Sequence, residues 1–180
     1  MSRLPLVDPS QAKGQAAELF AAVKEKMGRV PNLMKAMANS PAVLEGYLGL
    51  SGALSHGTLD PQIRERIAIG TAESNGCEYC LAAHSLLGKL AGLDDEERQA
   101  NRTGHSHDPK ADAALAFART LLERKGEVTA ADVQAIRSAG FDDGQVAEII
   151  AHVALNVLTN YFNNAVETPI DFPAVPPLTV

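Results

Sequence analysis

Two cysteines, one histidine and one glutamate carry the spacing that could do chemistry in this sequence. Cys77 and Cys80 are the only cysteines among 180 residues, and His84 follows Cys80 by four positions. A Cys-x-x-Cys pair either holds half of a zinc site or cycles between dithiol and disulfide. On a helix, all three side chains would share one face. Because the ordinary pKa of histidine is about 6.5, His84 could take a thiol proton at neutral pH.

The cysteines are expected at the start of a helix. Ser74-Asn75-Gly76 is typical of a helix end, so a new helix should begin at Cys77. The unpaired N–H groups and the macrodipole at a helix start stabilise a thiolate. We predict Cys80 as the attacking thiolate because His84 is nearer to it, and Cys77 as the resolving thiol. The reverse assignment stays open, since Cys77 lies closer to the helix N-terminus.

Glu65 is the candidate that would orient His84. It lies on a predicted helix over residues 61–74, which a short turn forces to pack beside the dithiol helix. Taken alone, Glu65 would more often be a solvated charge paired with a neighbouring arginine. The catalytic set predicted from spacing is therefore Cys77, Cys80, His84 and Glu65.

A zinc site is the main alternative for the cysteine pair. Zinc takes four ligands and the chain has no second cysteine pair, so His56 or His152 would have to complete a site with Cys77, Cys80 and His84. We expect neither a metal nor another cofactor. His152 lies in an apolar run, which indicates a hydrogen-bonded core histidine.

The composition favours helices over strands. Aromatic residues make up 4% and tryptophan is absent. Prolines follow Ser40 and Asp60, which is typical of helix starts, and Asp94, Thr129 and Asp142 begin capping-box spacings. The chain is therefore predicted to be all-α, with helices near residues 10–27, 32–39, 41–55, 61–74, 77–91, 94–101, 110–125, 130–139 and 143–164.

One domain over residues 1–167 is expected, followed by a tail. Residues 168–180 contain four prolines and several apolar side chains, so the tail should lie extended along an apolar surface, in this subunit or a neighbouring one. Gly46, Gly49 and Gly52 recur at every third position, which most simply permits a close helix crossing. Residues 161–164 are expected to pack at a polar helix end.

Charge and hydropathy exclude several classes of protein. There are 22 acidic and 16 basic residues, giving a net charge of −6 without a basic stripe, so no nucleic-acid partner is expected. The most apolar stretch, 146–158, is interrupted by Glu148, His152 and Asn156, and the N-terminus lacks an apolar signal core. The expectation is a cytoplasmic protein without a membrane partner.

The spacing Glu65-x11-Cys77-x2-Cys80-x3-His84 resembles the alkylhydroperoxidase branch of the AhpD-like, or carboxymuconolactone decarboxylase, superfamily. The resemblance covers about residues 30–170, and residues 156–163 are similar to the peroxidase-related subgroup. It implies an all-α fold and a thiol peroxidase or disulfide reductase without haem or flavin. Glu65 and His84 would relay protons to the cysteines. A hydroperoxide substrate, a thiol or dithiol reductant and homo-oligomers, commonly trimers or hexamers, are also implied.

Tyr79 departs from the pattern of that branch. It stands where the best-studied hydroperoxidases have histidine, which predicts a lower peroxidase efficiency. Two other interpretations remain: a redox-sensing or zinc-binding oligomeric scaffold without turnover, and a decarboxylase-type lyase. The second is disfavoured because the decarboxylase branch lacks the paired cysteines.

Overall fold

The computed structural model describes residues 2–176 and 178, and every regular element in them is an α-helix. The predicted all-α class is confirmed, and each predicted segment is a helix, with identical bounds at 41–55 and 61–74 and bounds within a few residues elsewhere. The helices are α1 (Gly14–Met27), α2 (Asn32–Met37), α3 (Pro41–Ser55), α4 (Pro61–Ser74), α5 (Glu78–Leu90), α6 (Asp95–Arg102), α7 (Pro109–Glu123), α8 (Ala130–Ser138) and α9 (Asp143–Val166).

The helix starts follow the predicted caps at four places. The side chains of Asp60, Asp94, Thr129 and Asp142 each accept a hydrogen bond from a backbone N–H of the first turn. Thr129 and Asp142 complete reciprocal capping boxes. Because these bonds satisfy N–H groups that a helix leaves unpaired, the caps set where α4, α6, α8 and α9 begin.

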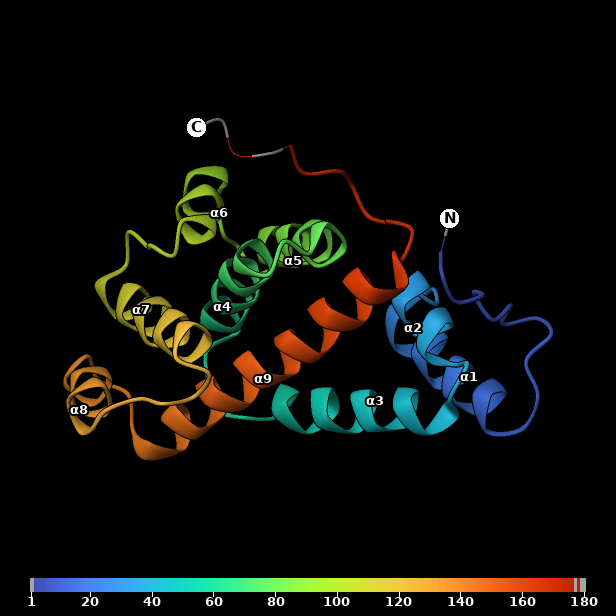
Figure 1. Ribbon diagram of the computed structural model, residues 1–180, viewed down its shortest axis with the longest axis horizontal. Coiled ribbons are helices and arrows are strands. Elements are labelled where there is room, and N and C mark those ends of the chain that lie inside the picture. Colours follow the sequence, from blue (N-terminus) through green and yellow to red (C-terminus); the bar gives the residue numbers. More distant parts are fainter. Residues whose placement is uncertain (1, 177, 179–180) are drawn as a thin grey trace.

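Helix α4 joins two hydrophobic cores. Ile69 and Ala72 face a core shared with α1, α2 and α5, whereas Ile63 and Ile67 face a core shared with α7, α8 and α9. Figure 1 shows α4 in the middle of the molecule, α9 running diagonally across it, and α3 beside α9. Residues on α4 are therefore held from several sides at once.

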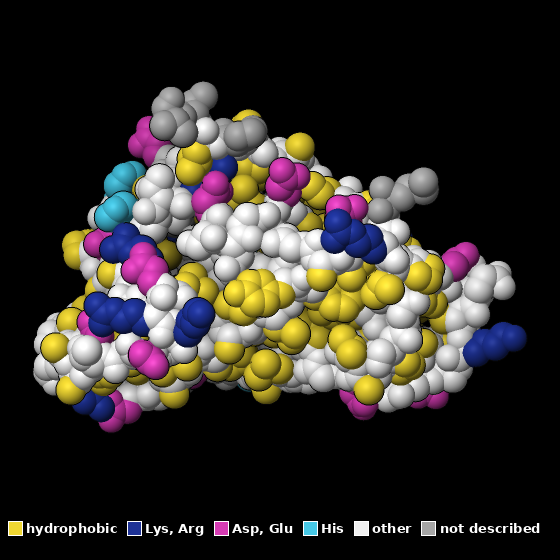
Figure 2. Space-filling model, viewed as in Figure 1, with side chains coloured by type: hydrophobic (Ala, Val, Ile, Leu, Met, Phe, Trp, Pro, Cys, Tyr) yellow, Lys and Arg dark blue, Asp and Glu magenta, His cyan; other side chains and the backbone are white. Residues whose placement is uncertain are grey.

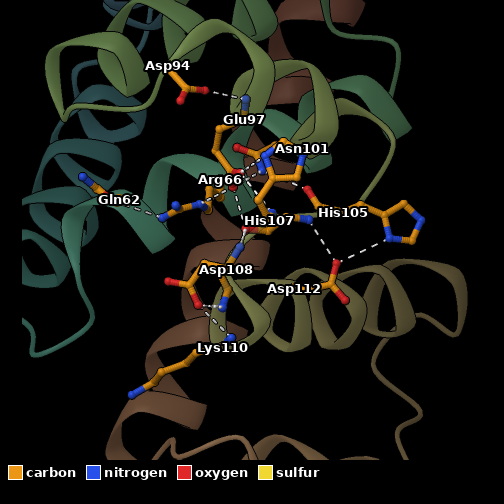
Figure 3. Close-up of polar contacts among 12 residues, drawn as sticks. Gln62, Arg66, Asp94, Glu97, Asn101, His105, His107, Asp108, Lys110 and Asp112 are labelled. Atoms are coloured by element: carbon orange, nitrogen blue, oxygen red, sulfur yellow. Dashed lines mark hydrogen bonds and ion pairs between the residues drawn. The ribbon is translucent and has the colours of Figure 1, made fainter.

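A buried ion pair also holds α4 in place. Arg66 of α4 donates to Glu97 of α6 at 2.7 Å, and both side chains are buried. Glu97 further accepts hydrogen bonds from Asn101, from the Ser106 hydroxyl and from the backbone N–H of His107 (Figure 3). The connection between α6 and α7 is thus fastened to α4, while the His107 ring itself is exposed.

The glycines of α3 do not mark a helix crossing, contrary to the expectation. Within the described part of the chain, no atom lies within 4 Å of a Cβ placed on Gly46, Gly49 or Gly52. Leu44 is the residue of α3 that is fully buried, whereas Val43 and Leu50 are exposed. Figure 2 shows hydrophobic side chains gathered over α3 and α9, so this face of the fold is open and apolar.

The chain after α9 is not helical as far as the structure describes it. Residues 168–176 and 178 contain no regular element and run from the end of α9 past α5 toward α6 (Figure 1). Arg102 of α6 donates to the carbonyl of Pro176 at 2.9 Å. The predicted tail of residues 168–180 also includes residues 177, 179 and 180, which lie outside the described residues. In the part that is described, no helix is long and apolar enough to cross a membrane.

Candidate active site

Cys77 and Cys80 form a disulfide at the start of α5. Their Cα atoms lie 5.3 Å apart, and Cys77 is the N-cap residue of the helix, as its position after Gly76 predicted. The Cys77 sulfur accepts a hydrogen bond from the backbone N–H of Cys80 at 3.2 Å. Both residues are nearly buried, with exposed fractions of 1% and 3%. The pair is therefore close enough to open and close without a change of fold.

The turn before the disulfide is fixed by the backbone and by α9. Gly76 has a φ of +61°, a conformation that glycine adopts without strain. The Asn75 side chain donates to Asn160 at 2.9 Å, and Asn164 donates to the Asn75 carbonyl at 2.8 Å. Two asparagines of α9 thus hold the residue that ends α4, and the cysteines follow directly.

The structure brings together His84 and Glu65, as the spacing suggested. The His84 Nδ1 atom lies 2.9 Å from the Glu65 Oε2 atom, and both side chains are partly buried, with about a fifth to a quarter of their surface exposed. The Glu65 carboxylate can therefore hold the proton of His84 on Nδ1 and leave Nε2 free as a base. Glu65 is not a solvated charge paired with arginine.

His84 lines two neighbouring cavities. A small one of about 80 Å³ is lined by Cys80, His84 and Asn163, with apolar side chains around them. A larger one of about 420 Å³ is lined by Glu65, His84 and His152, together with both polar and apolar side chains. Because Cys80 lines the small cavity with His84, a small molecule placed there would meet both groups.

The contacts of the Tyr79 hydroxyl argue against a role in proton transfer. Its hydroxyl accepts a hydrogen bond from the Leu33 N–H at 3.1 Å and donates one to Asp171 at 2.8 Å. Burial is the main cause that raises the pKa of Tyr79 far above the usual range of tyrosine, and the nearby Asp171 adds to it. The hydroxyl therefore keeps its proton at every physiological pH.

The segment after α9 covers this part of the site. Asp171 accepts from Tyr79, from the Asn32 N–H at 3.1 Å and from Arg29 at 3.0 Å. Phe172 packs edge-on against the Tyr79 ring, with centroids 5.5 Å apart, and lines the small cavity with Cys80. Asp171 and Phe172 carried no signal in the sequence, because nothing in a proline-rich tail says which helix it contacts.

Asn163 is the other residue that the sequence interpretation missed. It was expected to pack at a polar helix end, yet its side-chain amide donates to the Cys80 sulfur at 3.2 Å. The available signal was the helical spacing of Asn156, Asn160 and Asn163, which places three amides on one face of α9.

The histidines considered as zinc ligands are not arranged for one. Among residues 2–176 and 178, no group of three or more His, Cys, Asp or Glu side chains is placed to hold a metal ion. His152 is buried as expected, but its Nε2 atom has no hydrogen-bond partner within the described part of the chain. Burial, followed by the nearby charge of Arg64, lowers the pKa of His152.

Comparison with known proteins gives a consistent assignment. Residues 41–123 match the model of the carboxymuconolactone decarboxylase family. A protein named alkyl hydroperoxide reductase Rv2159c, from Mycobacterium tuberculosis, is 29% identical over 90 residues. This alignment covers 49% of the present chain and 26% of that protein, so the chain spans about a quarter of the length of its curated relative.

Solved structures extend the similarity to nearly the whole chain. A peroxidase-related protein from Ralstonia eutropha JMP134 with an alkylhydroperoxidase AhpD core has a TM-score of 0.86 and 26% identity, over 94% of this chain and 92% of that one. A peroxidase-related protein from Silicibacter sp. TM1040 has a TM-score of 0.81 and 26% identity, over 93% and 89% of the two chains. The debrominase Bmp8, at 19% identity and a TM-score of 0.79, shares the fold.

Proposed function

We propose that the chain is a thiol-dependent hydroperoxide reductase of the AhpD-like and carboxymuconolactone decarboxylase superfamily, whose family model matches residues 41–123. The observation that carries the proposal is the Cys77–Cys80 disulfide at a helix start, with His84 one turn further along α5, where it lines the small cavity with Cys80 and is hydrogen-bonded to Glu65. The two relatives with AhpD-like or peroxidase-related names share the fold and about a quarter of the residues. No haem or flavin is needed, since the reduced dithiol supplies the two electrons and is oxidised to the disulfide.

In the proposed cycle, Cys80 attacks the peroxide. An electron pair of the thiolate forms a bond to the terminal peroxide oxygen, the O–O bond breaks, and the alkoxide leaves. His84, which took the thiol proton, returns it to the alkoxide and releases an alcohol. Cys80 becomes a sulfenic acid that keeps the terminal oxygen and its hydrogen.

The second half of the proposed cycle regenerates the enzyme. The Cys77 sulfur attacks the sulfenic sulfur, and the oxygen leaves as water with the proton of the Cys77 thiol. A thiol or dithiol reductant then reduces the disulfide by exchange. Cys80 is favoured as the attacking residue because it lines the small cavity with His84, whereas Cys77 caps the helix beneath it.

The role proposed for Glu65 is to orient His84. A carboxylate that is hydrogen-bonded to Nδ1 favours the tautomer with its proton on Nδ1 and an unprotonated Nε2. The same carboxylate stabilises the imidazolium that forms when His84 takes a thiol proton. The proposed partners are thus a hydroperoxide and a thiol reductant, and the proposed assembly is a homo-oligomer.

A redox-sensing scaffold is the second candidate, and one contact favours it. Tyr79, which lies between the two cysteines, donates a hydrogen bond to Asp171 of the C-terminal segment. A movement of the cysteine turn when the disulfide opens would therefore be transmitted to that segment. Turnover separates the two functions, because an enzyme reduces hydroperoxide repeatedly while a reductant restores its dithiol, whereas a sensor needs to react only once.

Peroxide consumption in the presence of excess dithiothreitol tests the proposal. The parent protein should consume many equivalents of an alkyl hydroperoxide, and Cys80→Ser should abolish this activity. In a parallel sample without dithiothreitol, reduced Cys77→Ser should react once and stop at the sulfenic acid. Consumption of no more than one equivalent by the parent would contradict the enzyme, and stoichiometric zinc that survives a competing chelator would contradict the redox dithiol.

A further inference from the structure

We propose that Asn163 is a further catalytic residue, whose side-chain amide first stabilises the Cys80 thiolate and then holds the sulfenic acid formed on it. The inference rests on the proposed function and adds one group that touches the reacting sulfur. It comes from one contact and one missing contact of the same side chain.

The contact is the hydrogen bond from the Asn163 Nδ2 atom to the Cys80 sulfur, at 3.2 Å. Asn163 is 3% exposed, so water competes little for this bond. A hydrogen bond to a charged acceptor is about twice as strong as one between neutral groups. After reduction, the bond therefore favours the thiolate of Cys80 over its thiol.

The fold aims this amide at Cys80. Asn160 and Asn164, on the same helix, hold Asn75 at the turn that precedes the cysteines. These bonds tie α9 to the start of α5 on both sides of Asn163. The amide therefore reaches the sulfur at a fixed distance and needs no rearrangement during the reaction.

The missing contact concerns the other end of the amide. The Asn163 Oδ1 atom is buried, and among residues 2–176 and 178 it has no hydrogen-bond partner. Leaving a buried acceptor unpaired costs roughly 1–3 kcal/mol, so such an atom in a native fold calls for an explanation. A disulfide offers it no donor, whereas a sulfenic acid on Cys80 carries an O–H group. We assign Oδ1 as the acceptor for that hydrogen.

Several other titratable groups lie near Cys80 and act on the same sulfur. Tyr47 of α3, Tyr79 and His84 of α5 line the small cavity with it, and Glu65 of α4 acts through His84. None of them contacts Asn163 through a hydrogen bond. Their effects on the Cys80 thiolate are therefore the same in the parent and in a variant of Asn163. The difference in reactivity between the two proteins measures the contribution of the amide.

The test uses a chain with a single thiol. In a Cys77→Ser background Cys80 is the remaining cysteine, and serine keeps an N-cap acceptor. The rate of iodoacetamide alkylation is measured against pH for this parent and for Asn163→Leu. We expect the midpoint of the variant at higher pH and a rate at neutral pH about tenfold lower, the loss expected for one bond to a charged group.

Asn156→Leu is the matched control. It removes a buried amide from the same helix, whose bond goes to the carbonyl of His152 and not to sulfur. The control should keep the parent midpoint. Asn163→Asp serves where leucine prevents folding, since it keeps the size, loses the donor and should move the midpoint further upward.

The sulfenic acid gives a second readout. With several equivalents of hydroperoxide, so that a second oxidation of the sulfur is possible, Cys77→Ser protein should yield a sulfenic adduct with dimedone, and Asn163→Leu in the same background should lose more of it to the sulfinic acid. Equal midpoints in the parent and in the folded Asn163 variants, or an equal shift in Asn156→Leu, would overturn the thiolate role. Equal adduct yields would overturn the role of Oδ1. Absence of peroxide turnover would instead contradict the proposed function, because alkylation does not depend on it.

Discussion

The hydroxyl of Tyr79, the residue that lies second between the two cysteines, donates a hydrogen bond of 2.8 Å to Asp171 in the segment after α9. Asp171 in turn accepts a hydrogen bond from the backbone N–H of Asn32, the first residue of α2. The N-cap residue of that helix is Pro31, whose side chain has no acceptor for this N–H. One carboxylate thus connects the disulfide turn, the start of α2 and the C-terminal segment.

This connection predicts the effect of Tyr79→Phe. The variant leaves the Leu33 N–H without its acceptor and frees one oxygen of Asp171, so the free energy of unfolding should fall by about 1–3 kcal/mol. Residues 168–176 should also be cut faster by proteases, which mass spectrometry of timed digests would show. Tyr161→Phe is the control, because Tyr161 is exposed. Equal cleavage in both variants would mean that Asp171 is held by Arg29 and Asn32 alone.

The buried carboxylate of Glu97 predicts how stability depends on pH. Burial would raise its pKa, but hydrogen bonds from Ser106, Arg66, Asn101 and the His107 N–H outweigh it and lower the pKa to about 2. Because the folded pKa lies below the unfolded value, Glu97 stabilises the fold above about pH 4.5, and this contribution is lost as the pH falls toward 2.

Glu97→Gln should therefore cost about 3 kcal/mol at neutral pH and flatten the loss of stability in acid. Urea unfolding at several pH values below 5 would measure both effects. Glu96→Gln is the control, because its carboxylate is exposed on the same helix turn. Parallel acid profiles for the parent and Glu97→Gln would show that other carboxylates govern acid unfolding.

The helices were predictable because their signals are local. Asp60-Pro61, Thr129 and Asp142 place the starts through hydrogen bonds within one turn, and the structure contains those bonds. The predicted proximity of Glu65 and His84 followed from the short turn between two helices. In both cases the sequence distance is small, so few alternative arrangements exist.

The contacts that were not predicted join distant parts of the chain. Asn163 is hydrogen-bonded to Cys80 over a sequence separation of 83 residues, and Asp171 to Tyr79 over 92. Neither the type of these side chains nor their spacing predicts the partner. The glycines of α3 were misjudged for a related reason: small residues permit a close neighbour but do not require one in the same chain.

His152 predicts a second pH dependence, closer to neutrality. Arg64, Glu148, Glu65 and His84 are the charged or titratable groups around it, and burial is the main cause that lowers its pKa. As the pH falls, His152 therefore becomes protonated at a higher pH in the unfolded chain than in the folded protein. The free energy of unfolding should then fall as the pH drops below about 6.5. His152→Leu should remove this part of the profile, which melting temperatures at about pH 8 and 5.5 would show. A parent profile flat over that range would contradict the assignment.

The open apolar face of α3 and α9 predicts self-association. Val43 and Leu50 on α3 and Leu158 and Tyr161 on α9 are exposed, and contiguous apolar surface is unusual on a monomer (Figure 2). We expect at least a dimer, and a trimer or hexamer is the assembly that the family resemblance implies. Leu50→Glu should shift the mass in light scattering toward the monomer, and removal of residues 168–180 should weaken the assembly. A parent protein that is monomeric at micromolar concentration would refute the prediction.

The His84–Glu65 pair predicts losses of activity that do not add. His84→Ala removes the group proposed to take the Cys80 proton, and Glu65→Gln removes the carboxylate that holds His84 at 2.9 Å. Each should slow peroxide consumption by roughly 10²-fold or more, the typical contribution of a positioned proton-transfer group. The double variant should be little slower than His84→Ala, because Glu65 acts through the imidazole that is already gone.

Thiol alkylation against pH separates this relay from a loss of folding. In both single variants the thiolate loses its charged partner, so the titration midpoint should move to higher pH while the far-ultraviolet circular dichroism stays that of the parent. Glu73→Gln, on the same helix and paired with Arg102, is the control for removing a carboxylate from α4. If Glu65→Gln keeps the parent rate and midpoint, Glu65 has no part in the reaction; if the two losses multiply in the double variant, the residues act independently and the proposed relay is wrong.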